Sequence, residues 1–166
     1  IAMFTKLRER YVGHPSRLLC SIFTAKIRYE TKHLFVAGTS MDYRLPPDTV
    51  STLSMKASVS AEVWSDPIAT LSGNVFWGQF PDVDSVFGGL EPFGKEGSEG
   101  ILVKHGGSVC VVPPVYSTVA SHYMQRMNDI LGLADQNRVP VSFCVFLRAE
   151  CFLDWSNAPK IGRAHV

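Results

Sequence analysis

Apolar positions in the first third of the chain recur at the three- and four-residue spacing of amphipathic helices. One helix is predicted over residues 1–11, and its apolar face consists of Met3, Phe4, Leu7 and Tyr11. A second is predicted to be capped by Ser16, and its core face is expected to consist of Leu18, Leu19, Ile22 and Phe23. A third is predicted from about Pro47 to Ala57, because proline is tolerated in the first turn of a helix.

The pattern changes to that of strands further along the chain. Residues 59–64 alternate between apolar and polar side chains, which predicts a strand that ends at Asp66-Pro67. Residues 108–112 and 139–147 are apolar runs typical of strands covered on both faces. Between these runs a helix is predicted to be capped by Ser117 and to end near Gly132; its apolar face consists of Val119, Tyr123, Met127, Ile130 and Leu131.

This strand–helix–strand order predicts an α/β fold with a mostly parallel sheet, in which the strands near residues 59–64, 109–112 and 141–147 are neighbours. Ligands of such sheets bind beyond the carboxyl ends of the strands, which places the expected site near Asp66-Pro67, residues 112–114 and Leu147-Arg148. The stretch from Thr70 to Gly106 is rich in glycine and aromatic residues and is predicted to be a long functional loop, helical only around residues 83–87.

Chain length and net charge limit the domain organisation and the kinds of partner that we expect. The 166 residues predict a single domain with a helical segment over residues 1–57, an α/β core over 58–147 and a tail over 148–166. The chain begins at Ile1 rather than at methionine, so we expect an incomplete piece of a longer protein. Sixteen Lys and Arg against fifteen Asp and Glu give a net charge of +1, so contact with nucleic acid would need a local basic patch.

The cysteines carry no metal-binding pattern. They stand far apart in the chain, at Cys20, Cys110, Cys144 and Cys151, without zinc-ligand spacing. We therefore expect buried thiols in a reducing, intracellular compartment and no metal site. No apolar run approaches the length of a membrane span, so no membrane association is predicted.

Three separated motifs resemble the methyltransferase domain of the phosphorylated-CTD-interacting-factor family. They are FPDVDSVFG at residues 80–88, GSVCVVPPV at 107–115 and PVSFCVFL at 140–147. Residues 45–69 are similar to the helix and first strand that precede the Ser-Pro-Leu-Asn turn of that family. The resemblance implies a Rossmann-like fold, S-adenosylmethionine as cofactor, RNA as partner, and methylation of the cap-adjacent adenosine in the nucleus.

The resemblance also implies where the site lies. The family's Asn/Asp-Pro-Pro-aromatic motif corresponds to residues Val112, Pro113, Pro114 and Val115, and Tyr116 is the neighbouring candidate for stacking on the substrate base. The implied cofactor residues are Asp66, Pro67, Ala69, Phe80 and Asp82. For the loop carboxylates Asp82 and Asp84 two alternatives stay open, contact with the cofactor or simple solvation, and solvation is favoured for both.

Two positions of the catalytic motif depart from the family. Val112 replaces a side chain that accepts a hydrogen bond from the target amine, and Val115 replaces the aromatic ring that stacks on the base. Asp66 and Ala69 replace the Ser and Asn of the cofactor turn. Three hypotheses follow: a degenerate relative that serves as an RNA-associated or scaffold subunit, an active RNA adenine methyltransferase, and a nucleotide-binding domain. The last lacks any GxGxxG or GxxxxGK stretch, and the first is favoured.

Overall fold

The computed structural model describes residues 2–31, 45–71, 74–93, 100–113 and 117–146, and within them the chain forms one five-stranded sheet. The strands are β1 (Val59–Val63), β2 (Val75–Trp77), β3 (Gly89–Leu90), β4 (Gly107–Val111) and β5 (Val141–Val145). Their order is β3-β2-β1-β4-β5, and every pairing is parallel. The predicted α/β class and the predicted neighbourhood of β1, β4 and β5 are thereby confirmed.

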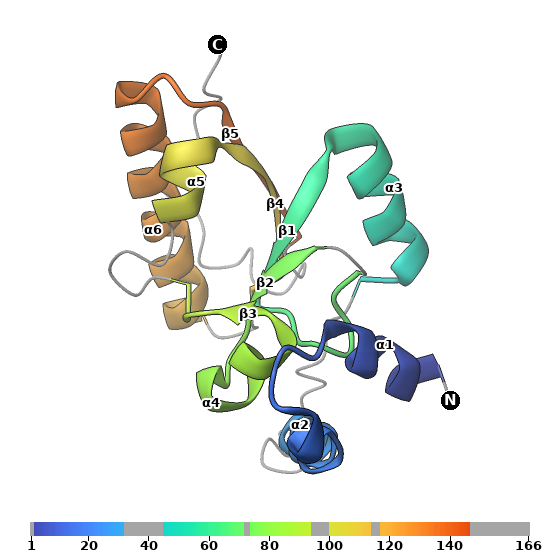
Figure 1. Cartoon of the computed structure of the whole chain (residues 1–166). Helices are drawn as coiled ribbons and strands as arrows, with labels where there is room; N and C mark the ends of the chain where they lie inside the picture. The colour runs from blue at the N-terminus through green and yellow to red at the C-terminus, as the bar shows by residue number, and fades with distance from the viewer. Residues whose placement is uncertain (1, 32–44, 72–73, 94–99, 114–116, 147–166) are drawn as a thin grey trace.

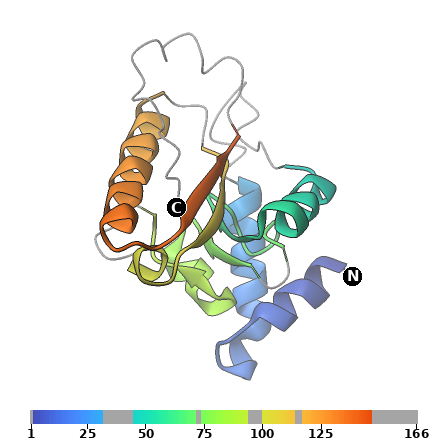
Figure 2. The same cartoon turned by 90° about the horizontal axis from the view of Figure 1, so that it is seen from above.

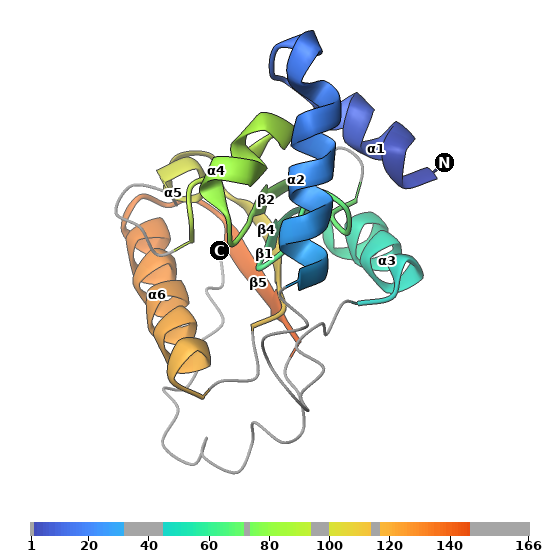
Figure 3. The same cartoon turned by 90° about the horizontal axis from the view of Figure 1, so that it is seen from below.

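Helices cover both faces of this sheet (Figures 1 and 2). The longer ones are α1 (Ala2–Arg10), α2 (Leu18–Thr31), α3 (Pro47–Ala57) and α6 (Ser117–Gln136), and the shorter ones are α4 (Pro81–Asp84) and α5 (Gly100–His105). Two 3-10 turns, η1 (Pro15–Arg17) and η2 (Ser85–Phe87), precede α2 and follow α4. Helices α5 and α6 lie on one side of the sheet and α3 on the other, while α2 lies against α1 and α4 (Figure 3).

Two apolar cores stabilise the described part of the fold. The larger one joins the sheet to α6, and its fully buried members include Val63, Val109, Val111 and Ile130. The aromatic rings of Trp77, Phe93 and Tyr123 extend this core. The smaller one joins α1 and α2 to α4 and η2 and consists of Leu7, Ile22, Ala25, Val83 and Phe87. The N-terminal helices therefore pack on the segment that follows β2.

The predicted core face of α2 is only partly right. Ile22 is 8% exposed, but Leu19 and Phe23 are 68% and 65% exposed. The buried face runs through Ile22, Ala25 and Tyr29, because α1 and α4 pack on that side of α2. The predicted cap is also wrong: Ser16 lies inside η1, and the ring of His14 accepts the hydrogen bond from the Ser16 backbone N–H.

The prediction of a long loop from Thr70 to Gly106 is wrong, because β2, β3 and α5 lie within it in addition to α4 and η2. Strands of three and two residues are too short to produce a readable alternation, and β2 is defined by its pairing with β1. The predicted end of α6 is wrong as well. The helix continues through exposed Gly132, since Ile130 and Ala134 still pack on the sheet on either side of it.

The burial of three features in the structure differs from what the sequence predicted. Glu62 in β1 is buried although the alternation placed it outside, because both faces of the central sheet are covered. The run that forms β5 is covered incompletely, with Ser142 exposed, since β5 lies at one edge of the sheet that the described residues form. Of the cysteines, Cys110 is buried, Cys144 is half-buried and Cys20 is exposed. Cys151 lies outside the described residues, among which no helix is long and apolar enough to cross a membrane.

Candidate functional site

The strand order places a topological switch between β1 and β4. From β1 the chain adds β2 and β3 on one side and then returns to add β4 and β5 on the other. Crevices at the carboxyl ends of such neighbouring strands are where open α/β sheets bind ligands. The turn that begins at Trp64 follows β1, and half-buried Val112 and Pro113 follow β4. The remaining motif positions Pro114, Val115 and Tyr116 lie outside the described residues.

The turn after β1 is held by Asp66, whose side chain is 3% exposed. Its Oδ1 accepts hydrogen bonds from the backbone N–H groups of Ile68 at 2.8 Å and Ala69 at 2.7 Å. Its carbonyl oxygen accepts the N–H and the hydroxyl of Thr70. Pro67 is buried within this turn and Ala69 is half-buried. Asp66 therefore acts first as the cap of its own turn.

Glu62 holds the far side of the same turn and was missed by the sequence reasoning. Its Oε1 accepts hydrogen bonds from the N–H of Leu71 at 2.9 Å and from Asn74 Nδ2 at 3.0 Å, and the hydroxyl of Ser65 donates to its Oε2. The available signal was a carboxylate inside a strand whose neighbours Ala61 and Val63 are apolar. A charge at such a position is rarely buried without hydrogen-bond donors.

The turn after β2 is organised by Asp84, which is fully buried rather than solvated as predicted. The hydroxyl of Tyr29 lies 2.7 Å from both carboxylate oxygens, and the backbone N–H of Phe80 donates to Oδ2 at 3.0 Å. Burial raises the pKa of Asp84 to about 6, although these two hydrogen bonds lower it. The charges of Asp66 and Asp82 raise this pKa further, so the turns after β1 and β2 share one electrostatic environment.

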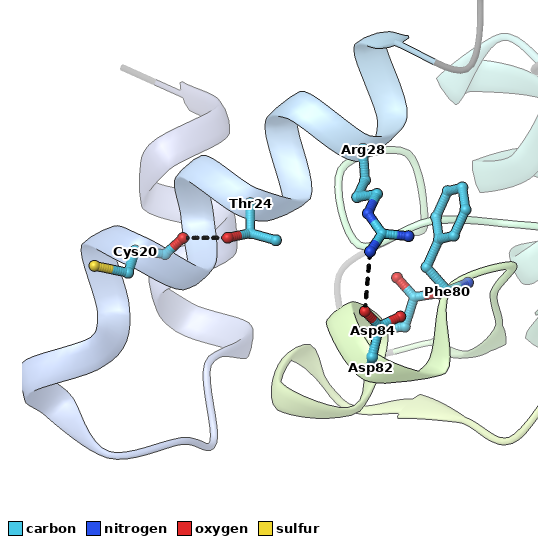
Figure 4. A network of polar contacts seen from close by, with 6 residues as sticks. All are labelled: Cys20, Thr24, Arg28, Phe80, Asp82 and Asp84. Atoms are coloured by element: carbon cyan, nitrogen blue, oxygen red, sulfur yellow. Dashed lines mark hydrogen bonds and ion pairs between the residues drawn. The ribbon is translucent and has the colours of Figure 1, made fainter. Parts of the chain in front are cut away.

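The last turns of α2 reach the same segment (Figure 4). Arg28 Nη2 lies 3.3 Å from Oδ2 of Asp82, and its guanidinium carbon lies 5.3 Å from the centre of the Phe80 ring. That ring also meets Tyr29 edge-on at 5.1 Å between centroids. The Asp82 side chain stays 63% exposed and is accessible to a ligand despite the ion pair.

Helix α1 contacts the turn after β1 from the other side. Lys6 Nζ donates to the carbonyl of Ile68 at 2.7 Å. The guanidinium of Arg10 donates to the carbonyls of Leu71 at 3.0 Å and Asn74 at 2.8 Å. Burial lowers the pKa of Arg10, and the charge of Glu62 opposes this effect. The helical spacing gave no sign of this role, because both cations belong to the polar face of a short helix.

The structure thus brings most of the described candidates together at one edge of the sheet. Asp66, Pro67 and Ala69 share the turn after β1, and Phe80 and Asp82 lie in the turn after β2. The two turns are joined where the N–H groups of Trp64 and Ser65 donate to the carbonyl of Trp77. Only the tertiary structure reveals that four further residues lie at this edge of the sheet: Arg10, Arg28, Tyr29 and Glu62.

A separate groove of about 540 Å³ opens where the turn between α1 and α2 meets α2 and α4. Among the predicted site residues only Asp82 lines it. The polar residues that line it also include His14, Arg17, Ser21 and Thr24. Within the described parts of the chain no group of three or more His, Cys, Asp or Glu side chains is arranged to hold a metal ion.

The chain matches the model of a known protein family. The family model described as "Phosphorylated CTD interacting factor 1 WW domain" matches residues 2–158, which is most of the chain. No curated protein matches the chain.

Proposed function

The chain belongs to the phosphorylated CTD interacting factor 1 family, and from this premise we propose that its sheet is an S-adenosylmethionine-dependent methyltransferase fold that associates with RNA and has degenerate catalysis. The observation that carries the proposal is the topological switch between β1 and β4. The turn after β1, which resembles the family's cofactor turn, and Val112-Pro113 after β4 follow neighbouring strands there, where such sheets bind ligands.

The chemistry of the two turns fits the cofactor in part. Asp82 follows β2 and presents an exposed carboxylate, which suits the ribose hydroxyls of a nucleoside. Backbone groups near Ala69 and the ring of Phe80 are the other groups expected to hold the cofactor. Asp66 already accepts two hydrogen bonds from its own turn, and Ala69 offers no polar side chain. When bound, S-adenosylmethionine supplies an activated methyl group on a sulfonium.

The catalytic motif supports degenerate chemistry. Val112 stands half-buried at the end of β4, where the family's motif has a side chain that accepts a hydrogen bond from the target amine. A valine cannot accept a hydrogen bond, so the amine loses the group that would orient it. Val115 likewise has no flat face on which a base could stack. We therefore assign this chain a role as an RNA-associated, nuclear subunit or scaffold within its family.

Isothermal titration of the chain with S-adenosylmethionine tests the cofactor part of the proposal. Each lost neutral hydrogen bond is worth about 0.5–1.5 kcal/mol, so two or three losses weaken binding roughly tenfold to a thousandfold. We expect measurable but weak binding that Asp82→Asn weakens further. The matched control is Asp48→Asn on α3, an exposed acidic residue on a different helix. A micromolar dissociation constant would contradict the degenerate cofactor turn, and complete absence of binding would contradict the assignment of this edge as a cofactor site.

Binding to a short adenosine-containing RNA, measured by fluorescence anisotropy at two salt concentrations, tests the second part. With a net charge of +1 the chain has no general basic field, so we expect weak, salt-dependent binding by the chain alone. Affinity unaffected by salt would contradict contact through phosphates. Lack of any binding would contradict the proposed association with RNA.

A further inference from the structure

The polar side chains of the α1–α2 hairpin converge on the two candidate cofactor turns. Lys6 and Arg10 donate to carbonyls in the turn after β1. Arg28 and Tyr29 are consecutive residues of α2. Arg28 pairs with Asp82, and Tyr29 donates a hydrogen bond to Asp84, in the segment that follows β2. The hairpin precedes the sheet in the sequence and contributes no strand to it. Its polar contacts nevertheless fall on the edge where the proposed function places the cofactor.

We propose that Tyr29 is a positioning residue that sets the turn from Phe80 to Asp82 by acting through the carboxylate of Asp84. This inference rests on the proposed function, because that turn matters for binding only if the edge holds the cofactor. Tyr29 itself is 1% exposed and does not reach the surface on which a ligand would lie.

The geometry of Asp84 leaves it little freedom. A tyrosine hydroxyl has one proton, so Tyr29 donates to one carboxylate oxygen at a time while the N–H of Phe80 donates to Oδ2. The carboxylate also fills the space beside Gly78, where any added Cβ would clash with Oδ2. Without the Tyr29 hydroxyl the carboxylate loses the partner that holds it beneath the N–H of Phe80.

The effect of this contact extends to Asp82. The N–H groups of Val83 and Asp84 both donate to the carbonyl of Phe80, so the first turn of α4 is built on that residue. Arg28 covers the Phe80 ring and pairs with Asp82 from the same end of α2 (Figure 4). A shift of the Phe80 backbone therefore moves the exposed carboxylate that would meet the ribose.

The contact between Tyr29 and Asp84 also makes the turn from Phe80 to Asp82 sensitive to pH. The Tyr29 hydrogen bond lowers the pKa of Asp84, whereas burial and the charges of Asp66 and Asp82 raise it to about 6. Arg28 pairs with Asp82 and so faces the same cluster. Removal of the Tyr29 hydroxyl takes away a group that favours the charged carboxylate. The protonation midpoint of Asp84 then moves to higher pH, which a purely space-filling role of Tyr29 would not cause.

The experiment compares the full chain with Tyr29→Phe and with Tyr11→Phe. The control removes a hydroxyl that donates within the hairpin itself, to the carbonyl of His14. The first measurement is the hydrogen-exchange protection factor of the Phe80 amide between pH 5 and pH 8. We expect Tyr29→Phe to lower protection about threefold to tenfold, the effect of one lost hydrogen bond, and to move the pH midpoint upward. Tyr11→Phe should change neither.

The second measurement is the affinity for S-adenosylmethionine at pH 7.5. We expect Tyr29→Phe to weaken it about threefold to tenfold relative to the unmodified chain. Unchanged Phe80 protection or an unmoved midpoint would overturn the inference, as would weakened protection with unchanged affinity. If the unmodified chain itself binds no cofactor, the proposed function fails, and the protection factor alone decides whether Tyr29 positions the turn.

A second variant covers the case in which Tyr29→Phe does not fold. Asp84→Asn keeps an oxygen that can accept from the N–H of Phe80 but cannot titrate. We expect its Phe80 protection factor to be independent of pH between 5 and 8. A midpoint near pH 6 that persists in Asp84→Asn would overturn the assignment of the titration to this carboxyl group.

Discussion

At the scale of single residues, the buried carboxylates at the carboxyl edge of the sheet hold loops. Asp66 caps the turn after β1, Glu62 ties that turn to the strand, and Asp84 supports the turn after β2. Each accepts at least one backbone N–H, which offsets part of the cost of burial. Burial still dominates at Asp84, whose pKa is raised to about 6.

This raised pKa predicts how stability depends on pH. Between its ordinary value near 4 and about 6, Asp84 binds a proton in the folded chain but not in the unfolded chain. Its contribution to the free energy of unfolding is therefore present at low pH and falls as pH rises through this range, by up to about 3 kcal/mol. Urea denaturation at pH 4.5 and pH 7 measures the change. Asp84→Asn should remove this part of the difference in the free energy of unfolding between pH 4.5 and pH 7. An identical difference in the variant and the unmodified chain would contradict the assignment of the pH dependence to Asp84.

Arg10 is the second residue with a quantitative consequence. Its guanidinium donates to the carbonyls of Leu71 and Asn74 and lies over the ring of Phe76. A lysine ammonium cannot reproduce this planar arrangement, so Arg10→Lys should lower the free energy of unfolding by about 1–3 kcal/mol. Exposed Arg8 on the same helix provides the matched control, Arg8→Lys. Equal denaturation midpoints for the two variants would show that the contacts contribute nothing.

At the scale of elements, α2 presents two apolar surfaces of different character. Ile22, Ala25 and Tyr29 face the protein, whereas Leu19, Phe23 and Ile27 recur at four-residue spacing on the exposed side. Both sets fit helical periodicity, so the period alone could not choose between them. The choice was made by α1 and α4, which pack against only one side of the helix.

Neighbouring substitutions on α2 separate the two surfaces. Ile22→Ser removes a side chain that is 8% exposed and should lower the free energy of unfolding by about 2–5 kcal/mol. Phe23→Ser changes a side chain that is 65% exposed and should alter it by no more than about 0.5 kcal/mol. Thermal unfolding of both variants gives the comparison. A larger loss for Phe23→Ser would mean that this surface is covered in the folded chain.

At the scale of the whole molecule, the sheet order decides which segments meet. Residues 64–66 and 112–113 are distant in sequence, and they become neighbours because β4 returns to pair with β1. The N-terminal hairpin then packs on the turns after β1 and β2, with Leu7 and Phe87 in their shared core. The N-terminal hairpin and the turns after β1 and β2 therefore lie together at one edge of the sheet.

A methyl-transfer assay tests the proposed degenerate catalysis. We expect no detectable transfer to adenosine in capped or uncapped RNA, because positioning of the amine is worth several powers of ten in rate and Val112 lacks the acceptor. Val112→Asn combined with Val115→Phe should restore transfer only if the cofactor site is intact, and Val112→Asn alone is the control. A radiolabelled methyl donor gives the readout. Turnover by the unmodified chain that is lost in Asp66→Ala or Tyr116→Ala would identify an active RNA adenine methyltransferase instead.

The amino-acid sequence by itself determined the α/β class, the parallel arrangement of β1, β4 and β5, and helices α1, α2, α3 and α6. These elements are long enough for periodicity and apolar runs to reveal them. Only the tertiary structure decided the positions of β2 and β3, the exposed side of α2, and the roles of Glu62, Tyr29 and Arg10. Strands of two or three residues exist through pairing with a neighbour. The half-buried side chain of Arg10 is stabilised by partners up to 77 residues away. Local sequence patterns do not show contacts between residues so far apart in the chain.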